Sequence, residues 1–174
     1  TPYKIDPKGW YISEKLDGVR SMWIPGCNMF ASRSMKEYFI PNWFKELMPD
    51  KCMLDGEFYN KTLNFQRLSG VIRRKQIINK IFINFTYNVF DIPLEELVNK
   101  TYTDRLKILK HVVKVCNTKW PMIRNKYADL NLPKRSPLRI VPQYVIKDFN
   151  YAYKFYKKII KRNGEGVILR LPNS

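Results

Sequence analysis

Three short clusters, each placing a charged side chain beside a glycine within apolar surroundings, constrain the fold of this chain more than any other feature. They are Lys15-Leu16-Asp17-Gly18, Leu54-Asp55-Gly56-Glu57 and Gly164-Glu165-Gly166-Val167. Burying an unpaired charge is costly, so these side chains need partners. Alternate residues of an extended segment share a face, so Asp55 and Glu57 lie together and repel unless a cation lies between them.

The segments around these clusters predict β-strands. They are rich in β-branched and aromatic residues, are bounded by turn formers, and cover residues 9–15, 19–24, 28–32 and 51–59. Asp-Gly between two strands is the commonest hairpin signal, so Asp17-Gly18 predicts a tight turn. Residues 81–90 alternate apolar and polar side chains and predict a further strand. Phe90 falls on its polar face, where an aromatic ring can be a platform for a flat ligand.

The rest of the chain predicts helices, a connection and a last strand. Helical spacing of apolar residues indicates helices near 40–48, 103–116 and 150–164, with Thr103 or Asp104 capping the second and Gly164 ending the third. Residues 117–139 read as a long connection, and residues 166–171 as a final strand. We therefore expect one α+β domain over residues 1–174, with antiparallel sheets flanked by helices.

The charge of the chain points to a polyanionic partner. There are 32 Lys and Arg residues against 15 Asp and Glu, a net charge of +17. This excess is larger than solubility requires and favours nucleic acid, although a merely soluble basic protein is the alternative. The basic run Arg73, Arg74 and Lys75 is a candidate for nucleic-acid contact.

The cysteines and the hydropathy exclude several other classes of protein. Three widely spaced cysteines and one histidine indicate neither a disulfide framework nor a Cys/His zinc site. No apolar run reaches the roughly 18 residues of a membrane span, and the first ten residues lack the apolar stretch of a signal peptide. We expect an intracellular monomer in a reducing compartment, with no membrane partner.

Five segments in order resemble the motifs of covalent nucleotidyltransferases. KLDGVR (15–20), SR (32–33), LDGEF (54–58), VFD (89–91) and GEGVILR (164–170) resemble motifs I, Ia, III, IIIa and IV. The similarity is closest to the adenylation domain of small ATP-dependent DNA ligases, and it covers residues 15–170. Chance turns would not reproduce five motifs in this order.

The resemblance implies a nucleotide cleft and a role for each motif residue. Lys15 would attack the α-phosphate of ATP to form lysine-AMP, with Asp17 assisting. The nucleotide-binding set would be Glu14, Lys15, Arg20, Arg33, Glu57, Phe90 and Arg170, in which Arg20 and Arg33 contact the sugar or phosphates, Glu57 the ribose and Phe90 the adenine. Glu165 and Asp17 would hold Mg²⁺ or Mn²⁺. AMP would then pass to the 5′-phosphate of nicked duplex DNA, which Arg33 would also contact, before the 3′-hydroxyl seals the nick.

The chemistry of lysine adds one requirement. A free lysine has a pKa near 10.4, so only about one in 2,500 is the nucleophilic amine at pH 7. The carboxylates of Asp17, Glu57 and Glu165 favour the protonated form. A bound metal ion, together with Arg20 and Arg33, has to outweigh them.

Other functions share these features. An RNA ligase or an mRNA capping guanylyltransferase would carry the same motif order, and a non-catalytic basic nucleic-acid-binding module would use the glycine clusters only as turns. Ligases of this family continue past motif IV to motif V and an OB-fold domain, which have no counterpart here after Arg170. We therefore expect an adenylation domain that would seal nicks poorly by itself.

Overall fold

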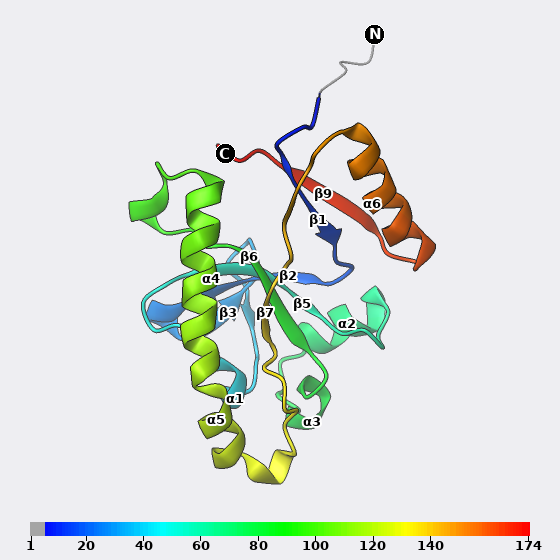
Figure 1. Cartoon of the computed structure of the whole chain (residues 1–174). Coiled ribbons are helices and arrows are strands. Elements are labelled where there is room, and N and C mark those ends of the chain that lie inside the picture. The colour runs from blue at the N-terminus through cyan, green and yellow to red at the C-terminus, as the bar shows by residue number, and fades with distance from the viewer. Residues whose placement is uncertain (1–5) are drawn as a thin grey trace.

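The computed structural model describes residues 6–174 and arranges them around two sheets (Figure 1). Residues 1–5, part of the segment considered for a signal peptide, lie outside the described residues. The smaller sheet has the order β8-β1-β9 and the larger sheet the order β4-β3-β2-β5-β6-β7. All neighbouring strands are antiparallel except β6 and β7, which are parallel. The strands are β1 Tyr11–Lys15, β2 Val19–Ile24, β3 Met29–Ala31, β4 Glu37–Tyr38, β5 Leu54–Tyr59, β6 Thr86–Asp91, β7 Leu138–Ile140, β8 Tyr144–Val145 and β9 Gly166–Arg170.

Helices cover both sheets, which confirms the predicted α+β class. The long helix α4 packs against β6 and β7, and α6 packs against β9 of the smaller sheet (Figure 1). Within residues 6–174, none of the helices has the length and apolar character that crossing a bilayer requires. The α-helices are α1 Asn42–Lys45, α2 Phe65–Ile72, α3 Asn79–Phe82, α4 Tyr102–Thr118, α5 Trp120–Lys126 and α6 Phe149–Lys161, and the 3-10 turns are η1 Pro25–Cys27, η2 Glu95–Leu97 and η3 Ala128–Leu130.

The predicted hairpin at Asp17-Gly18 is wrong. β1 pairs with β8 and β9, whereas β2 pairs with β3 and β5, so the two strands belong to different sheets. Gly18 does not have the positive φ of a hairpin turn. It is needed for space, because a Cβ there would lie 2.3 Å from the Phe58 carbonyl oxygen. The Asp-Gly pair therefore carries the chain from one sheet to the other.

The predicted strand over 81–90 is correct only in its second half. Helix α3 ends at Phe82, and β6 begins at Thr86. Alternation along that strand would put Phe82 on the polar face with Phe90, but Phe82 is buried and packs on Phe85 with ring centroids 5.2 Å apart. The Phe85 N–H donates to the Phe82 carbonyl, which closes a turn. Tertiary packing of the two rings outweighs the local alternation of apolar residues.

The structure also differs from the predicted cap of one helix and from the predicted long connection. Helix α4 is capped by Thr101, whose hydroxyl accepts a hydrogen bond from the Asp104 N–H, and not by Thr103 or Asp104. The predicted long connection over 117–139 contains α5, η3 and the start of β7. Helix α5 has Pro121 in its first turn and buries Trp120 and Ile123, so packing stabilises a helix where periodicity was weak.

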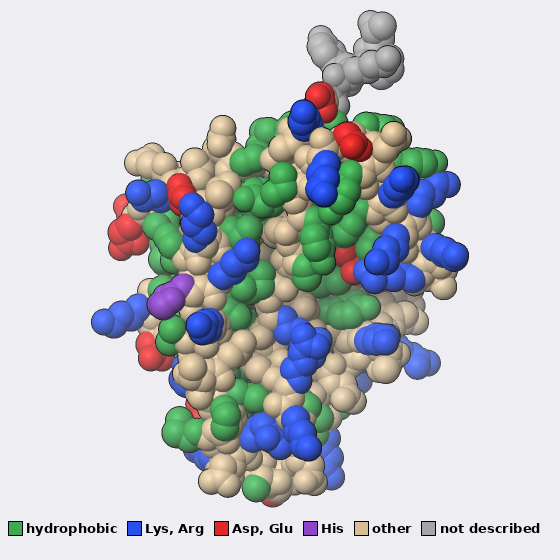
Figure 2. Space-filling view, in the orientation of Figure 1, with side chains coloured by type: hydrophobic (Ala, Val, Ile, Leu, Met, Phe, Trp, Pro, Cys, Tyr) green, Lys and Arg blue, Asp and Glu red, His purple; other side chains and the backbone are tan. Residues whose placement is uncertain are grey.

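Basic side chains are spread over the surface and do not form one tail. In the orientation of Figure 1, Lys and Arg side chains (blue in Figure 2) are distributed over the whole visible face and outnumber Asp and Glu. The exposed basic residues of α6 are one part of this distribution.

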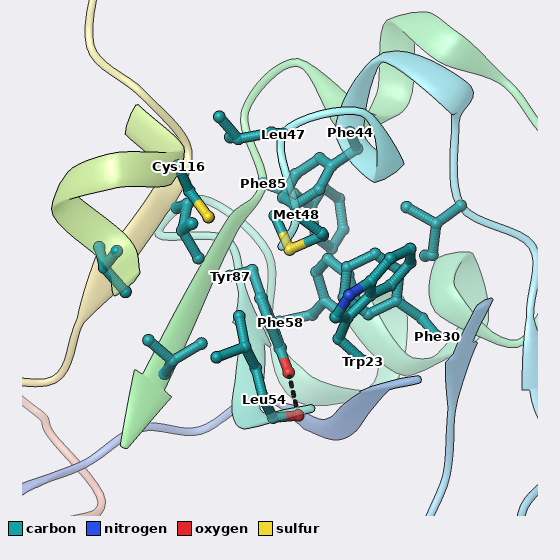
Figure 3. Packing of buried hydrophobic residues seen from close by; sticks show 14 of the residues in the cluster. Trp23, Phe30, Phe44, Leu47, Met48, Leu54, Phe58, Phe85, Tyr87 and Cys116 are labelled. Carbon is teal, nitrogen blue, oxygen red and sulfur yellow. Dashed lines mark hydrogen bonds between the residues drawn. The ribbon is translucent and has the colours of Figure 1, made fainter. Parts of the chain in front are cut away.

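An aromatic core fixes the larger sheet and leaves its other face polar. Tyr87 is fully buried, and its hydroxyl donates to the Leu54 carbonyl at 3.1 Å (Figure 3). The same hydroxyl lies 2.8 Å from the Ser21 carbonyl, to which it also donates. The rings of Phe30 and Phe58 each lie 5.0 Å from the Tyr87 ring. Because side chains alternate along a strand, β2, β5 and β6 turn their remaining side chains to the opposite face.

Candidate active site

A cleft of about 530 Å³ is lined by residues from both sheets. It contains every residue that the sequence assigned to catalysis, nucleotide binding or metal binding: Glu14, Lys15, Asp17, Arg20, Arg33, Glu57, Phe90, Glu165 and Arg170. The basic run Arg73, Arg74 and Lys75 follows α2, is exposed and is not part of this lining. The structure thus brings together side chains from positions 14 to 170.

Lys15 ends β1 and forms an ion pair with Glu165. The two strands β1 and β9 are antiparallel, with Lys15 opposite Gly166. Gly166 has a φ of 153°, which residues with a Cβ rarely adopt. This register sets the Glu165 carboxylate against the Lys15 ammonium, and the two side chains are 36% and 47% exposed to solvent. The ammonium is therefore held within the cleft but remains accessible.

Glu57 lies next to Gly18, where the chain passes from the smaller sheet to the larger one. Its Oε1 accepts a hydrogen bond from the Gly18 N–H at 3.1 Å. Burial raises the pKa of Glu57 to about 6, although the Gly18 hydrogen bond and the charges of Lys15 and Arg20 act in the opposite direction. A carboxyl group with this pKa changes its charge just below neutral pH.

Arg20 supplies the cation that the acidic pair of β5 requires. It lies opposite Glu57 in the sheet and forms a two-pronged ion pair with Asp55, Nε to Oδ1 at 3.0 Å and Nη2 to Oδ2 at 2.6 Å. Asp55 is buried, whereas the Arg20 side chain is 44% exposed. Arg20 is thus fixed by the protein while part of it stays open to the cleft.

A β-bulge directs Phe90 into the cleft. Asp91 pairs with Asp55 and Val89 with Gly56, so Phe90 has no partner in β5. Bulges of this kind re-aim a side chain. The guanidinium carbons of Arg20 and Arg170 lie 5.5 and 5.8 Å from the centre of the Phe90 ring. Two cations therefore lie near the ring, and each is itself bound by a carboxylate, Arg20 by Asp55 and Arg170 by Asp91.

The remaining predicted residues occupy less central places. Glu14 accepts a hydrogen bond from Arg162, just after α6. Asp17 and Arg33 line the cleft and are exposed. Arg170 also lines the cleft, but its Nη1 donates to Asp91.

Two parts of the site escaped the sequence reasoning. Asp91, the last letter of VFD, was not assigned a role, yet it binds Arg105 and Arg170. Val141 and Gln143 also line the cleft, and they lie just beyond the predicted connection over 117–139, where the sequence predicted no element and no site residue. A charged residue at the end of an apolar strand was the available signal for Asp91, whereas Val141 and Gln143 offered none.

The acidic side chains of the cleft suit a metal ion that takes only one or two ligands from the protein and the others from a bound phosphate compound and water. Among residues 6–174, no three Asp, Glu, His or Cys side chains gather around one point. Mg²⁺ commonly uses one or two carboxylates and completes its shell with phosphate oxygens and water. Glu165 and Asp17 fit this mode.

Comparisons with known proteins point in one direction. A family model described as "ATP dependent DNA ligase domain" matches residues 3–174. A Haemophilus influenzae protein named DNA ligase is 27% identical over 167 residues, which are 96% of this chain and 53% of that protein. The chain thus spans about half the length of this relative.

Solved structures share the fold. A structure from a study of DNA binding by Lig E DNA ligases superposes with a TM-score of 0.78 at 20% identity, covering 98% of this chain and 58% of that one. The Chlorella virus DNA ligase-adenylate gives a TM-score of 0.68 at 20% identity, covering 95% and 55%.

Proposed function

The chain belongs to the ATP-dependent DNA ligase domain family, and from this membership we propose that it is the adenylation domain of a ligase that seals nicks in duplex DNA. The domain extends over residues 1–174 in this proposal. The observation that carries it is the position of Lys15, at the end of β1 in a cleft that is lined by at least one residue from each of the other four motifs.

Lys15 is the nucleophile of the proposed reaction. Its neutral Nζ attacks the α-phosphorus of ATP, a nitrogen–phosphorus bond forms, and the bond to the bridging oxygen breaks to release pyrophosphate. The lysine proton has to leave before or during this step. Glu165 is the carboxylate in contact with Nζ, so this contact has to break before Nζ can attack.

The other residues bind and orient the nucleotide. The Phe90 ring stacks on the adenine. Glu57 accepts hydrogen bonds from the ribose hydroxyls. Arg20, fixed by Asp55, and Arg33, at the rim of the cleft, contact the sugar or phosphates. Preorganised charges of this kind stabilise developing charge without reorganisation in the reaction. Positioning and charge neutralisation dominate phosphoryl-type transfer.

Glu165 and Asp17 would hold a divalent cation, Mg²⁺ or Mn²⁺. When bound, such an ion neutralises phosphate charge. In the second and third steps AMP passes to the 5′-phosphate of a nick and the 3′-hydroxyl then displaces it. The basic surface, including Arg33, Arg73, Arg74 and Lys75, binds the duplex in this proposal.

The test uses the full-length protein and two labelled nucleotides. We expect covalent labelling by ATP and not by GTP, and sealing of nicked DNA in preference to nicked RNA. Labelling by GTP would favour a capping guanylyltransferase, and preference for nicked RNA would favour an RNA ligase. The absence of any covalent label, with duplex binding retained, would identify a non-catalytic module.

A further inference from the structure

One carboxylate outside the predicted set ties the two sheets together. Asp91 ends β6 directly after Phe90, and four donors meet its side chain. Arg105 donates through Nε and Nη2 at 2.9 and 3.1 Å, Arg170 through Nη1 at 2.8 Å, and the Ile92 N–H at 2.9 Å. These four hydrogen bonds match the acceptor capacity of an ionised carboxylate.

The group is shielded from solvent. The side chains of Asp91, Arg105 and Arg170 are 18%, 15% and 25% exposed. Burial by itself would raise the pKa of Asp91, but the hydrogen bonds and charge of Arg105 keep it below its ordinary value. Asp91 is therefore charged at neutral pH, and removing it would leave two partly buried cations without their partner.

Arg170 connects this carboxylate to the smaller sheet. Its guanidinium lies 4.4 Å from the centre of the Tyr102 ring, at the start of α4. The Tyr102 hydroxyl donates to the Phe90 carbonyl at 2.9 Å. Tyr11, which is opposite Arg170 in β1, packs edge-on against Tyr102 at 5.5 Å. The ends of β6 and β9, with β1 and α4, thus meet at one junction.

Two cleft residues close in sequence to this junction come from different sheets. Phe90 precedes Asp91 on β6, and Ile168 lies two residues before Arg170, on the same face of β9. Both line the cleft. We infer that Asp91 is a positioning residue: by holding Arg170, it sets the separation of Phe90 and Ile168, between which a flat base would bind. This inference rests on the proposed nucleotide binding and requires no contact between Asp91 and the nucleotide.

The experiment separates binding of the base from binding of the phosphates. In the full-length protein, Asp91→Asn, Arg170→Gln and the double variant are assayed for self-adenylation, with inorganic tripolyphosphate as a competitor that has no base. We expect KM for ATP to rise about tenfold in each single variant, with kcat within about threefold. Because both residues act through one contact, the double variant should show no further rise. The inhibition constant of tripolyphosphate should stay unchanged.

A matched control and three possible outcomes test the inferred role of Asp91. Glu46→Gln also removes a carboxylate that binds a cation and a hydroxyl, those of Lys126 and Tyr127, but outside the cleft, and it should leave KM unchanged. A higher KM in Arg170→Gln alone would mean direct contact with the nucleotide and overturn the inference. Equal weakening of ATP and tripolyphosphate would also overturn it, because it would report a general loss of structure. A wild-type protein that binds no ATP would instead contradict the proposed function.

A second variant covers the case in which Asp91→Asn does not fold. Arg170→Lys keeps a positive charge but loses the planar guanidinium that donates to Asp91 and lies over the Tyr102 ring. We expect it to raise KM for ATP at an unchanged inhibition constant for tripolyphosphate. An unchanged KM would overturn the inference.

Discussion

The ammonium of Lys15 and the carboxylate of Glu165 form an ion pair across β1 and β9, although 150 positions separate them in the chain. An ammonium engaged in this contact cannot act as a nucleophile. The contact also occupies the carboxylate that would bind a metal ion. Nucleotide transfer therefore requires the pair to separate.

Self-adenylation should depend on a divalent cation through this ion pair. A cation that binds Glu165 removes the partner of the Lys15 ammonium and so favours loss of its proton. We expect the pH at which the rate is half-maximal to decrease as Mg²⁺ is added. Rates measured against pH at several Mg²⁺ concentrations check this. A profile that keeps its position at every concentration would contradict it.

Glu57→Gln should stabilise the fold while weakening nucleotide binding. Folding raises the pKa of Glu57 from 4.5 to about 6, so the folded chain binds the proton more tightly than the unfolded chain. Stability from this group is full below about pH 4.5 and lost as the pH rises through about 6. Because Glu57 is partly exposed, we expect the variant to gain only about 1 kcal/mol at pH 8 and nothing near pH 4.5.

Denaturant unfolding at the two pH values measures this difference. The exposed Glu95→Gln is the control, and its free energy of unfolding should change by less than about 0.5 kcal/mol. A Glu57→Gln protein that is less stable than the wild type at pH 8 would contradict this prediction, because it would show that the ionised Glu57 stabilises the fold.

Gly18→Ala should destabilise the domain and displace Glu57. The new Cβ would lie 2.3 Å from the Phe58 carbonyl oxygen and 2.7 Å from Glu57 Cγ, and the backbone oxygen cannot move aside. We expect a loss of about 1–3 kcal/mol in the free energy of unfolding. Gly26→Ala meets no atom within 4 Å and should have almost no effect. Equal stabilities of the two variants would contradict the close approach at Gly18.

The basic run after α2 should contribute to duplex binding. Replacing Arg73, Arg74 and Lys75 by alanine should lower the slope of log affinity against log salt by about 2–3, since each phosphate contact contributes about 0.9. The matched control replaces Lys107, Lys110 and Lys114 of α4, which packs on the sheet face opposite the cleft. Binding of nicked duplex at several salt concentrations measures both slopes. Equal slopes for the two triple variants would remove this run from the interface.

Local signals predicted most of the site but not how the strands pair. The alternation of side chains placed Asp55 and Glu57 on one face, and Arg20 is the cation found beside them. Asp-Gly is a local turn signal, however, and carries no information on which strands pair in the sheets. The partner of β1 is β9, more than 150 residues later, so the hairpin prediction failed.

Long-range packing explains the other errors. Phe82 and Phe85, which a strand would turn to opposite faces, are both buried in the core together with residues of α4 and the larger sheet, and the chain turns between them. Asp91 gains its role only because α4 and β9 bring Arg105 and Arg170 to it. No property of residues 89–91 alone could identify these two partners.

The covalent lysine-AMP is the centre of this account, and the mass of the intact full-length protein tests it most directly. After incubation with ATP and Mg²⁺, the wild-type protein should gain the mass of one AMP. Lys15→Arg should gain nothing, because a guanidinium stays protonated and cannot attack. An adduct of equal mass on Lys15→Arg, or a wild-type protein that binds ATP but forms no adduct, would contradict it.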